Sequence, residues 1–448
     1  MLRAFRLKTS IIRLDSPFFA CLNTPRLKKI AIIALIVIWV ISGIYTVNRQ
    51  MHSSSADFRE FYTVNHQLLH PIEERKHEVP YTYPPFFHVL IAAFSWMPLG
   101  IAAALWYLFC SASIFITVKL LYRIANNTNE RLPPVFMGVP ITMSIGLILN
   151  DLGMGNCNLV VLFCLVLCLY LFCLKREFLS GIALAASITL KFLPGIFLVY
   201  FLYKQRYRVV VGALIGSLIF TGLFPIAAFG PQKGLEVVKE WVNLMLPSGA
   251  SAVNQVQERW FERENIYRGT NQSLRAVLHR FLQPVPAIRG QKPMGNVNVV
   301  SFPQTVVNII YVILVAAILT ISAFLLRLPP ATTGQPPLVM LEFSFVIFLM
   351  LLLSPVTWVN YLVHMIVCHF ALFHFLRRLE PSSADYQITL KCLIAAFILS
   401  ILGATPLTQA LAVPFLGMLV IGFATAYNLR REHLRLAVSK KSEHYRIQ

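Results

Sequence analysis

The sequence is poor in charge. Only 13% of its 448 residues are charged, which is about half the share of an average soluble domain. So few charges cannot cover a water-exposed surface of this size, whereas 57% of the residues are hydrophobic and the mean hydropathy is +0.67. The composition therefore excludes an ordinary soluble protein and indicates a polytopic membrane protein.

Several motifs that carry chemistry are also missing. The sequence has no P-loop, no dinucleotide-binding fingerprint and no zinc-ligand spacing, so nothing in it predicts a nucleotide, a cofactor or a metal. The eight cysteines show no obvious disulfide framework. The net charge of +20 comes from basic residues at the ends of apolar runs, which is typical of cytoplasmic loops and does not predict nucleic-acid binding.

Membrane spans can be located because roughly 20 apolar residues cross a bilayer. We expect an all-α fold, a polytopic membrane helical bundle with about 11–13 membrane helices and external juxtamembrane helices. Two further segments are ambiguous: one is short and bounded by prolines (84–98), and one is interrupted by Lys-Phe-Leu-Pro (178–203). The clear candidate spans are residues 30–47, 101–122, 134–150, 157–174, 207–229, 304–327, 338–355, 360–376, 388–404 and 408–428.

Positive charges indicate how the two ambiguous segments lie, because short cytoplasmic loops carry an excess of Lys and Arg. If residues 84–98 crossed the membrane, Lys119, Arg123 and Arg131 would lie outside, so we expect this segment along the outer surface. Residues 178–203 have basic residues at both ends, which favours a re-entrant hairpin of two half-helices with its tip near Lys191. A proline costs a helix interior about 3 kcal/mol, so a break there is expected.

These choices place both termini in the cytoplasm. We expect a basic N-terminus at residues 1–29 and a basic tail at residues 429–448. Between them lies one integral membrane domain, residues 30–428, with external loops at 48–100 and 230–303. The first apolar run lacks a small-residue cleavage site, so we expect an uncleaved helix. No repeat and no separate soluble domain are visible.

Aspartate is the rarest charged residue, with only Asp15, Asp57, Asp151 and Asp385 in the chain. Only Asp57 and Asp151 fall on the external face. Asp57 fits a solvated loop acid or the N-cap of an interfacial helix, and it also fits a general base held at the membrane surface. For Asp151 we expect a role in a turn.

Other external residues allow a similar choice. Tyr81 and Tyr83 fit interfacial anchors or aromatic faces that stack on sugars. Asn156 and Asn158 fit a plain turn or an amide site for a hydroxyl-rich ligand. Lys191, inside an apolar stretch, either snorkels to the surface or provides a cation for a lipid phosphate.

Polar residues in the later segments also allow both a structural and a functional interpretation. Asn271 begins a formal glycosylation sequon, and Arg275 and His279 share one face of an amphipathic helix over residues 271–282. Tyr361 is a candidate interfacial anchor beside a proline break. His364 lies one turn deeper, where a lone histidine is more often structural than a ligand.

In their order along the chain, these segments resemble glycosyltransferase family 87, polyprenyl-phosphate-mannose-dependent mannosyltransferases with the GT-C membrane fold. The matching stretches are DFREFY, YTYPPFFHVLIAAFSWMPLG, GNCN, GIALAASITLKFLPGIFLVYFLYKQRYR, NQSL and SPVTW. The resemblance implies inverting transfer of a hexose, mannose by the family's example, with Asp57 as the catalytic base. It also places Tyr83, Asn158, Lys191 and Asn271 at or near the donor and acceptor cavity.

The chain departs from the family in two motifs. The family often shows Gly-Gln-x-Asn where this chain has Gly155-Asn156-Cys157-Asn158, and it often carries histidine after Ser-Pro-x-x-Trp, where this chain has Asn360 and Tyr361. If that histidine assists the leaving phosphate, either His364 or His279 substitutes for it or the donor differs. The residues expected to bind donor or acceptor are Arg59, Tyr81, Tyr83, Asn156, Asn158, Lys191, Asn271, Arg275, His279, Asn360, Tyr361 and His364.

The resemblance also implies location and partners. We expect a multi-pass protein of the cell (inner) membrane with its active site on the extracytoplasmic face, no cofactor and no tightly bound metal. The expected partners are a polyprenyl-phosphate-linked sugar donor, a glycolipid or glycan acceptor and membrane lipids, without nucleic acid. Two alternatives stay open: a transporter or flippase of lipid-linked sugars, and a surface-polysaccharide ligase or polymerase that depends on Arg275 and His279.

Overall fold

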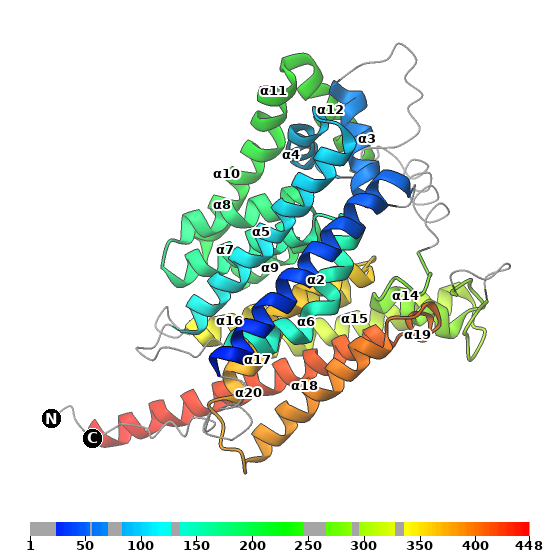
Figure 1. Ribbon diagram of the computed structural model, residues 1–448. Coiled ribbons are helices and arrows are strands. Elements are labelled where there is room, and N and C mark those ends of the chain that lie inside the picture. The colour runs from blue at the N-terminus through cyan, green and yellow to red at the C-terminus, as the bar shows by residue number, and fades with distance from the viewer. Residues whose placement is uncertain are drawn as a thin grey trace.

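The computed structural model describes residues 24–53, 56–69, 83–126, 135–245, 266–288, 295–327 and 336–447 (Figure 1). Over these residues the regular elements are all helices, apart from one isolated bridge between Asn271 and Trp358. Nine of the described helices are long and apolar enough to cross a membrane. The predicted all-α polytopic bundle is therefore confirmed.

The bundle has a buried centre and a lipid-facing rim. In α16 (Pro336–Leu353) and in η3 (Val359–Met365) with α17 (Ile366–Leu376), 94% of the span is buried. In α2 (Pro25–His52) and α15 (Gln304–Leu326) only 11% is buried, although these helices are equally apolar. Exposed apolar side chains on helices of this length are expected to face the lipid hydrocarbon.

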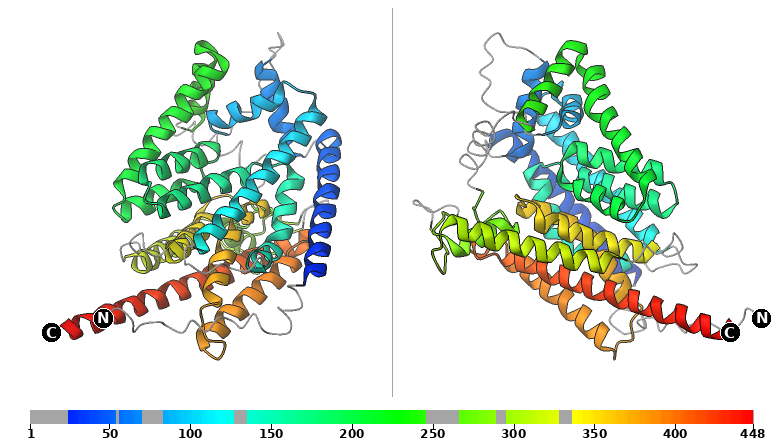
Figure 2. Two further views of the ribbon diagram at one scale, coloured as in Figure 1. Left: turned by 60° about the vertical axis from the view of Figure 1, so that its left-hand side comes forward. Right: turned by 180° about the vertical axis from the view of Figure 1, so that it is seen from behind.

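The last helix, α20 (Val413–Ile447), is longer than expected. It continues through most of residues 429–448, which we expected to form a separate tail. In Figure 2 this helix projects well beyond its neighbours. The remaining spans and short helices are α5 (Leu99–Ala125), α6 (Val135–Met154), α7 (Asn158–Cys173), α10 (Tyr207–Leu218), η2 (Ile219–Leu223), α11 (Phe224–Phe229), α12 (Pro231–Met245), α14 (Leu274–Leu282), α18 (Ala384–Leu402) and α19 (Pro406–Ala410).

Two short helices, α3 (Asp57–Leu69) and α4 (Pro85–Ser95), gather at one end of the bundle (Figure 1). At about 1.5 Å per residue, α4 is far too short to span the hydrocarbon core. The hydroxyl of Tyr62 in α3 donates to the carbonyl oxygen of Met97, just beyond α4, at 2.8 Å. Residues 84–98 therefore contain a short helix that is tied to α3 and is too short to cross the membrane by itself.

The segment between α7 and α10 folds back on itself. It consists of α8 (Glu177–Leu190), the turn η1 (Leu193–Gly195) and α9 (Ile196–Tyr203). The helix ends at Lys191, whose backbone is extended (φ −160°, ψ 128°). Arg206, after α9, pairs with Glu177, at the start of α8, at 3.2 Å. The two ends of the segment meet, so it is a re-entrant hairpin with Lys191 near its tip.

Close contact between α8 and α10 holds one arm of the hairpin. A Cβ atom at Gly181 would collide with the carbonyl oxygen of Val209, and one at Gly212 would collide with that of Phe178. The two backbones can approach so closely only because both positions are glycine, the arrangement common between membrane helices.

The hairpin predicts that topology reporters fused at its two ends lie on the same side of the membrane. Reporter domains fused after Lys175 and after Arg208 should show the same compartment, because Glu177 and Arg206 lie together. Alkaline phosphatase and green fluorescent protein activities, measured as a pair for each fusion, give the side. Opposite sides for the two fusions would mean one kinked crossing instead of a hairpin.

The end of the bundle that holds Glu177 and Arg206 also contains a buried ion pair. Lys204 contacts Glu342 of α16 at 3.1 Å, and Tyr200 donates to the same carboxylate at 2.8 Å. Both charged side chains are almost completely buried. This ion pair therefore lies at the end of the hairpin opposite its tip. It is separate from the polar groups around Lys191, which lie near the tip.

Candidate active site

Asp57 is the first residue of α3 and is half-buried. Its Oδ2 accepts a hydrogen bond from Nδ2 of Asn156 at 2.7 Å. A carboxylate in this position is also stabilised by the positive end of the helix. Asp57 therefore lies one residue inside the helix instead of at the N-cap position that the sequence suggested, and its side chain contacts a second site residue.

The turn between α6 and α7 presents Asn156 to Asp57. Gly155 has φ +71°, and a Cβ atom there would lie 2.8 Å from Gln50 and Phe58, so the turn requires glycine at this point. Its carbonyl oxygen accepts from the indole N–H of Trp106 at 2.9 Å. The turn is therefore fixed by packing and directs the neighbouring asparagine inward.

Lys191 occupies the centre of the site. Its ammonium donates to Oδ1 of Asn158 at 2.9 Å and to Oδ1 of Asn156 at 3.4 Å. It also lies 3.6 Å from the centre of the Tyr361 ring, close enough for a cation–π interaction. The residue is only 8% exposed. The snorkelling interpretation is wrong, because the cation is held inside the protein by two amides and an aromatic face.

Asp151 differs from its predicted role. It lies in the last turn of α6 rather than in the turn that follows, and it is fully buried. One oxygen accepts from Nδ2 of Asn158 at 2.6 Å, and the other accepts from the backbone N–H of Leu159 at 3.3 Å. Asp151 does contact the turn, but it also extends the hydrogen-bonded chain that begins at Asp57.

Aromatic rings form a wall beside this chain. Tyr83 stacks on Phe87 at 4.2 Å and meets the edge of Phe61 at 5.0 Å, and Lys191 lies 5.8 Å from its ring centre. Burial raises the pKa of Tyr83 well above its ordinary value. Its hydroxyl therefore stays protonated, and the residue can offer a ring face and a hydrogen-bond donor to a bound sugar.

The helix η3 contributes three buried residues, Asn360, Tyr361 and His364. Nδ1 of His364 lies 2.8 Å from the carbonyl oxygen of Tyr361. Its Nε2 is buried and has no hydrogen-bond partner among the described residues. An unpaired buried polar atom of this kind requires a reason, and a ligand atom would provide one.

Asn271 joins two segments of the chain. Its Oδ1 accepts from the backbone N–H of Ser273 at 3.1 Å and of Thr357 at 2.8 Å, and its Nδ2 donates to the carbonyl oxygen of Ile266 at 2.8 Å. The fully buried amide is occupied by these bonds. Asn271 thus anchors the segment that leads into η3, instead of pointing into the chain of polar groups.

The structure places the remaining predicted residues away from Lys191. Arg59 donates to the carbonyl oxygen of Met51 at 2.9 Å. His279 stacks on Tyr267 at 4.6 Å, and Arg275 is half-buried on the same helix, α14. Tyr81 lies outside the described residues. In the described part of the chain, no group of three His, Cys, Asp or Glu side chains could hold a metal ion.

Sequence analysis also missed a supporting residue, Gln50. Its side chain donates to the carbonyl oxygen of Met154 at 3.2 Å and accepts from the backbone N–H of Arg59 at 3.2 Å. It therefore ties the end of α2 to the end of α6 and the start of α3. A polar residue near the end of an apolar span was the only sequence signal.

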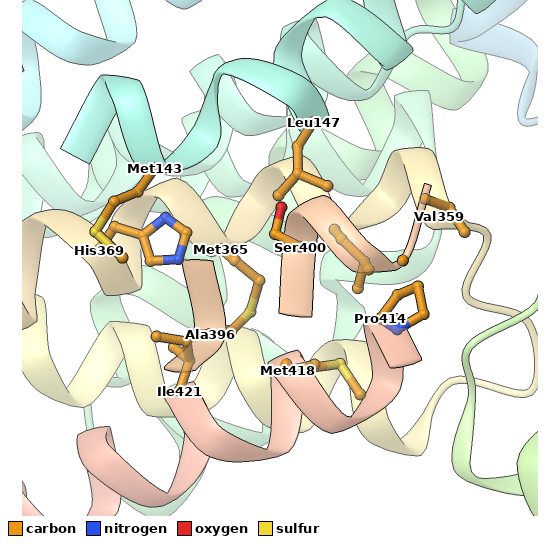
Figure 3. Close-up of a pocket in the computed structure, with 13 residues that line it drawn as sticks. Met143, Leu147, Val359, Met365, His369, Ala396, Ser400, Pro414, Met418 and Ile421 are labelled. Carbon is orange, nitrogen blue, oxygen red and sulfur yellow. The ribbon is translucent and has the colours of Figure 1, made fainter. Parts of the chain in front are cut away.

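An apolar pocket lies on the other face of η3 (Figure 3). A 3₁₀-helix brings residues three apart onto one face, so Val359, Leu362 and Met365 line the pocket whereas Tyr361 and His364 do not. The sulfur-rich lining includes one polar ring, His369, which is paired with Ser144 at 2.8 Å. The pocket offers little to catalysis, and we assign the reacting groups to the polar side.

A model of glycosyltransferase family 87 matches residues 81–355, which is more than half of the chain. The chain belongs to glycosyltransferase family 87. A comparison with curated proteins found no match.

The family assignment makes the protein a membrane glycosyltransferase, which uses a sugar donor and an acceptor. The matched residues include Tyr83, the turn at 155–158 and Lys191, and they end before η3. Asp57 lies before the matched residues. Its place in the site therefore rests on its hydrogen bond to Asn156.

Proposed function

We propose that this glycosyltransferase moves a hexose, mannose in the first instance, from a polyprenyl-phosphate sugar to a glycolipid or glycan acceptor. One observation carries the proposal. Asp57 and Lys191 bind the same amide, that of Asn156, at 2.7 and 3.4 Å. The Asn156 side chain thereby holds a proton acceptor and a cation close together. The proposed transfer needs both, because the attacking hydroxyl must lose a proton and the leaving phosphate gains a negative charge.

The transfer is a single displacement. The acceptor hydroxyl gives its proton to Asp57, and its oxygen forms the new bond to the anomeric carbon. The bond from that carbon to the phosphate oxygen breaks at the same time, on the opposite face, so the configuration inverts. Polyprenyl phosphate leaves with one more negative charge, which the preorganised ammonium of Lys191 offsets.

The neighbours of Lys191 suit the remaining parts of the donor. Tyr83 and Tyr361 present ring faces for the sugar. Nδ1 of His364 donates to the carbonyl oxygen of Tyr361, so Nε2 of the neutral ring is an acceptor and is available to a sugar hydroxyl.

The donor class can be tested with purified protein in lipid nanodiscs. Label should pass from polyprenyl-phosphate mannose to extracted membrane glycolipids, and not from nucleotide-activated mannose under the same conditions. Thin-layer chromatography of the lipid phase separates donor from product. Transfer from the nucleotide sugar alone would contradict the proposed donor.

We also propose that the site faces the extracytoplasmic side, with both termini in the cytoplasm. In a chain cleared of reactive native cysteines, Gln67→Cys on the exposed side of α3 should react with an impermeant maleimide added to intact cells. Ser382→Cys, in the exposed turn before α18, should react only after the membrane is opened. Labelling of Ser382→Cys in intact cells would reverse the sides.

A further inference from the structure

A buried carboxylate that the transfer step does not use lies on the far side of Lys191. Asp151 is fully buried, and its two oxygens accept from Asn158 at 2.6 Å and from the backbone N–H of Leu159 at 3.3 Å. A buried carboxylate is costly unless hydrogen bonds and a nearby cation compensate for it. A neutral residue would serve better if the position only had to form a turn.

The chemistry of the neighbours fixes the direction of the Asn158 amide. A carboxylate only accepts hydrogen bonds and an ammonium only donates them. The NH₂ group of Asn158 must therefore face Asp151, and its oxygen must face Lys191, at 2.9 Å. Asn156 repeats the arrangement on the other side, with its NH₂ group toward Asp57 and its oxygen toward Lys191.

We propose that Asp151 is a positioning residue, whose carboxylate orients Asn158 so that the amide oxygen holds the ammonium of Lys191 in place. It touches no reacting atom and acts through these two residues. The inference rests on the proposed function only for the catalytic role of Lys191, which is to offset the charge on the leaving phosphate. The hydrogen-bonded chain then has one cation at its centre and a carboxylate at each end.

An amide at position 151 cannot replace the carboxylate. The carboxylate has an acceptor for each of two donors, the NH₂ group of Asn158 and the N–H of Leu159. An amide has one oxygen, so its NH₂ group would face one of these donors. Either the start of α7 loses a hydrogen bond, or Asn158 turns over and presents its NH₂ group to the ammonium of Lys191.

The single substitution Asp151→Asn should therefore lower kcat per folded protein by about 100-fold, the cost of a small misplacement of a reacting group. The KM for the donor should change little. The matched control is Asp385→Asn, since Asp385 pairs with Arg431 away from the site, and it should keep the wild-type kcat. Wild-type kcat in folded Asp151→Asn would overturn the inference.

An exchange of the two side chains provides a sharper test. The double variant Asp151→Asn with Asn158→Asp places an amide at position 151 and a carboxylate at position 158, where every donor again has an acceptor. It should recover most of the kcat that either single variant loses. If a single variant does not fold, the double variant should still fold and transfer sugar, because its hydrogen bonds are complete. Losses that simply multiply in the double variant would contradict the proposed coupling.

Thermal unfolding tests the same link without any substrate. In the wild-type background Asp151→Asn should lower the unfolding midpoint. In the Lys191→Met background it should raise the midpoint, because the carboxylate is then buried without its cation. An equal decrease in both backgrounds would contradict the inference. A wild type that transfers no sugar from a polyprenyl phosphate would overturn the proposed function, and the thermal cycle would still decide this one.

Discussion

Replacing Asp57 by asparagine should lower sugar transfer by about 10²–10⁴-fold, the usual contribution of a positioned general base. The substitution removes the proton acceptor but keeps the size of the side chain and its bond to Asn156. It also removes the favourable interaction of the carboxylate with the positive end of α3, so a control that removes a charge from the same helix turn is needed. Initial rates at saturating donor, with the folded protein quantified by gel filtration, measure the effect.

The control for this prediction is Glu60→Gln in the first turn of the same helix. It removes an equal charge from the same helix end, so it reports any general electrostatic effect on α3. Glu60 is exposed, and its substitution should leave transfer near the wild-type rate. If Asp57→Asn is as active as this control, Asp57 serves only the helix, and the proposed base is wrong.

Replacing Lys191 by methionine should have an effect of similar size. Methionine fills much of the same volume but cannot offset the charge that develops on the leaving phosphate. Loss of one preorganised electrostatic group costs about 10²–10³-fold in kcat, and we expect that fall here with correct folding. The measurement is single-turnover transfer with the donor bound in advance, which separates chemistry from binding.

Lys175→Met is the matched control for this second prediction. Lys175 is exposed in the turn between α7 and α8, near the end of the hairpin remote from its tip. The same chemical change there should leave the single-turnover rate unaltered. A folded Lys191→Met variant with a normal single-turnover rate would show that the buried cation only stabilises the hairpin.

Charge and proline predicted the course of the chain well. The hairpin follows from basic residues at both ends of an apolar segment and a proline near its middle, and Glu177 bound to Arg206 confirms the return. The prediction that residues 84–98 lie along the outer surface rests on the same count of charges. Both features depend on local sequence and on the cost of moving Lys and Arg across a membrane.

The members of the site were partly predictable. Lys191 stood out because ionisable residues are expensive at membrane depth, Asp57 because external aspartates are rare in this chain, and Asn156 and Asn158 as amides in an external turn. The structure brings these four residues into one hydrogen-bonded chain. Their pairing was not predictable, since it depends on how distant helices pack. Asp151 was assigned to a turn because it belongs to a short stretch with two glycines between two apolar spans, and nothing in that stretch indicated its complete burial.

Packing also explains why some candidates lie elsewhere. Asn271 resembled a ligand-binding amide, but its side chain bonds the backbone of Ile266 and of Thr357 and so joins two segments of the chain. His279 shared a helix face with Arg275 as predicted, and the ring is stacked on Tyr267. In each case the sequence showed that a polar group was present, and only the fold showed which partner satisfies it.

One measurement tests the central claim most directly. Wild-type protein and Asp57→Asn would be reconstituted in proteoliposomes with radiolabelled polyprenyl-phosphate mannose and acceptor glycolipid, and the anomeric configuration of the product would be determined. We predict that the wild type moves the label to the acceptor with inverted configuration, and that Asp57→Asn forms almost no product. Label that crosses the bilayer still attached to its lipid phosphate, or equal product from both proteins, would contradict the account.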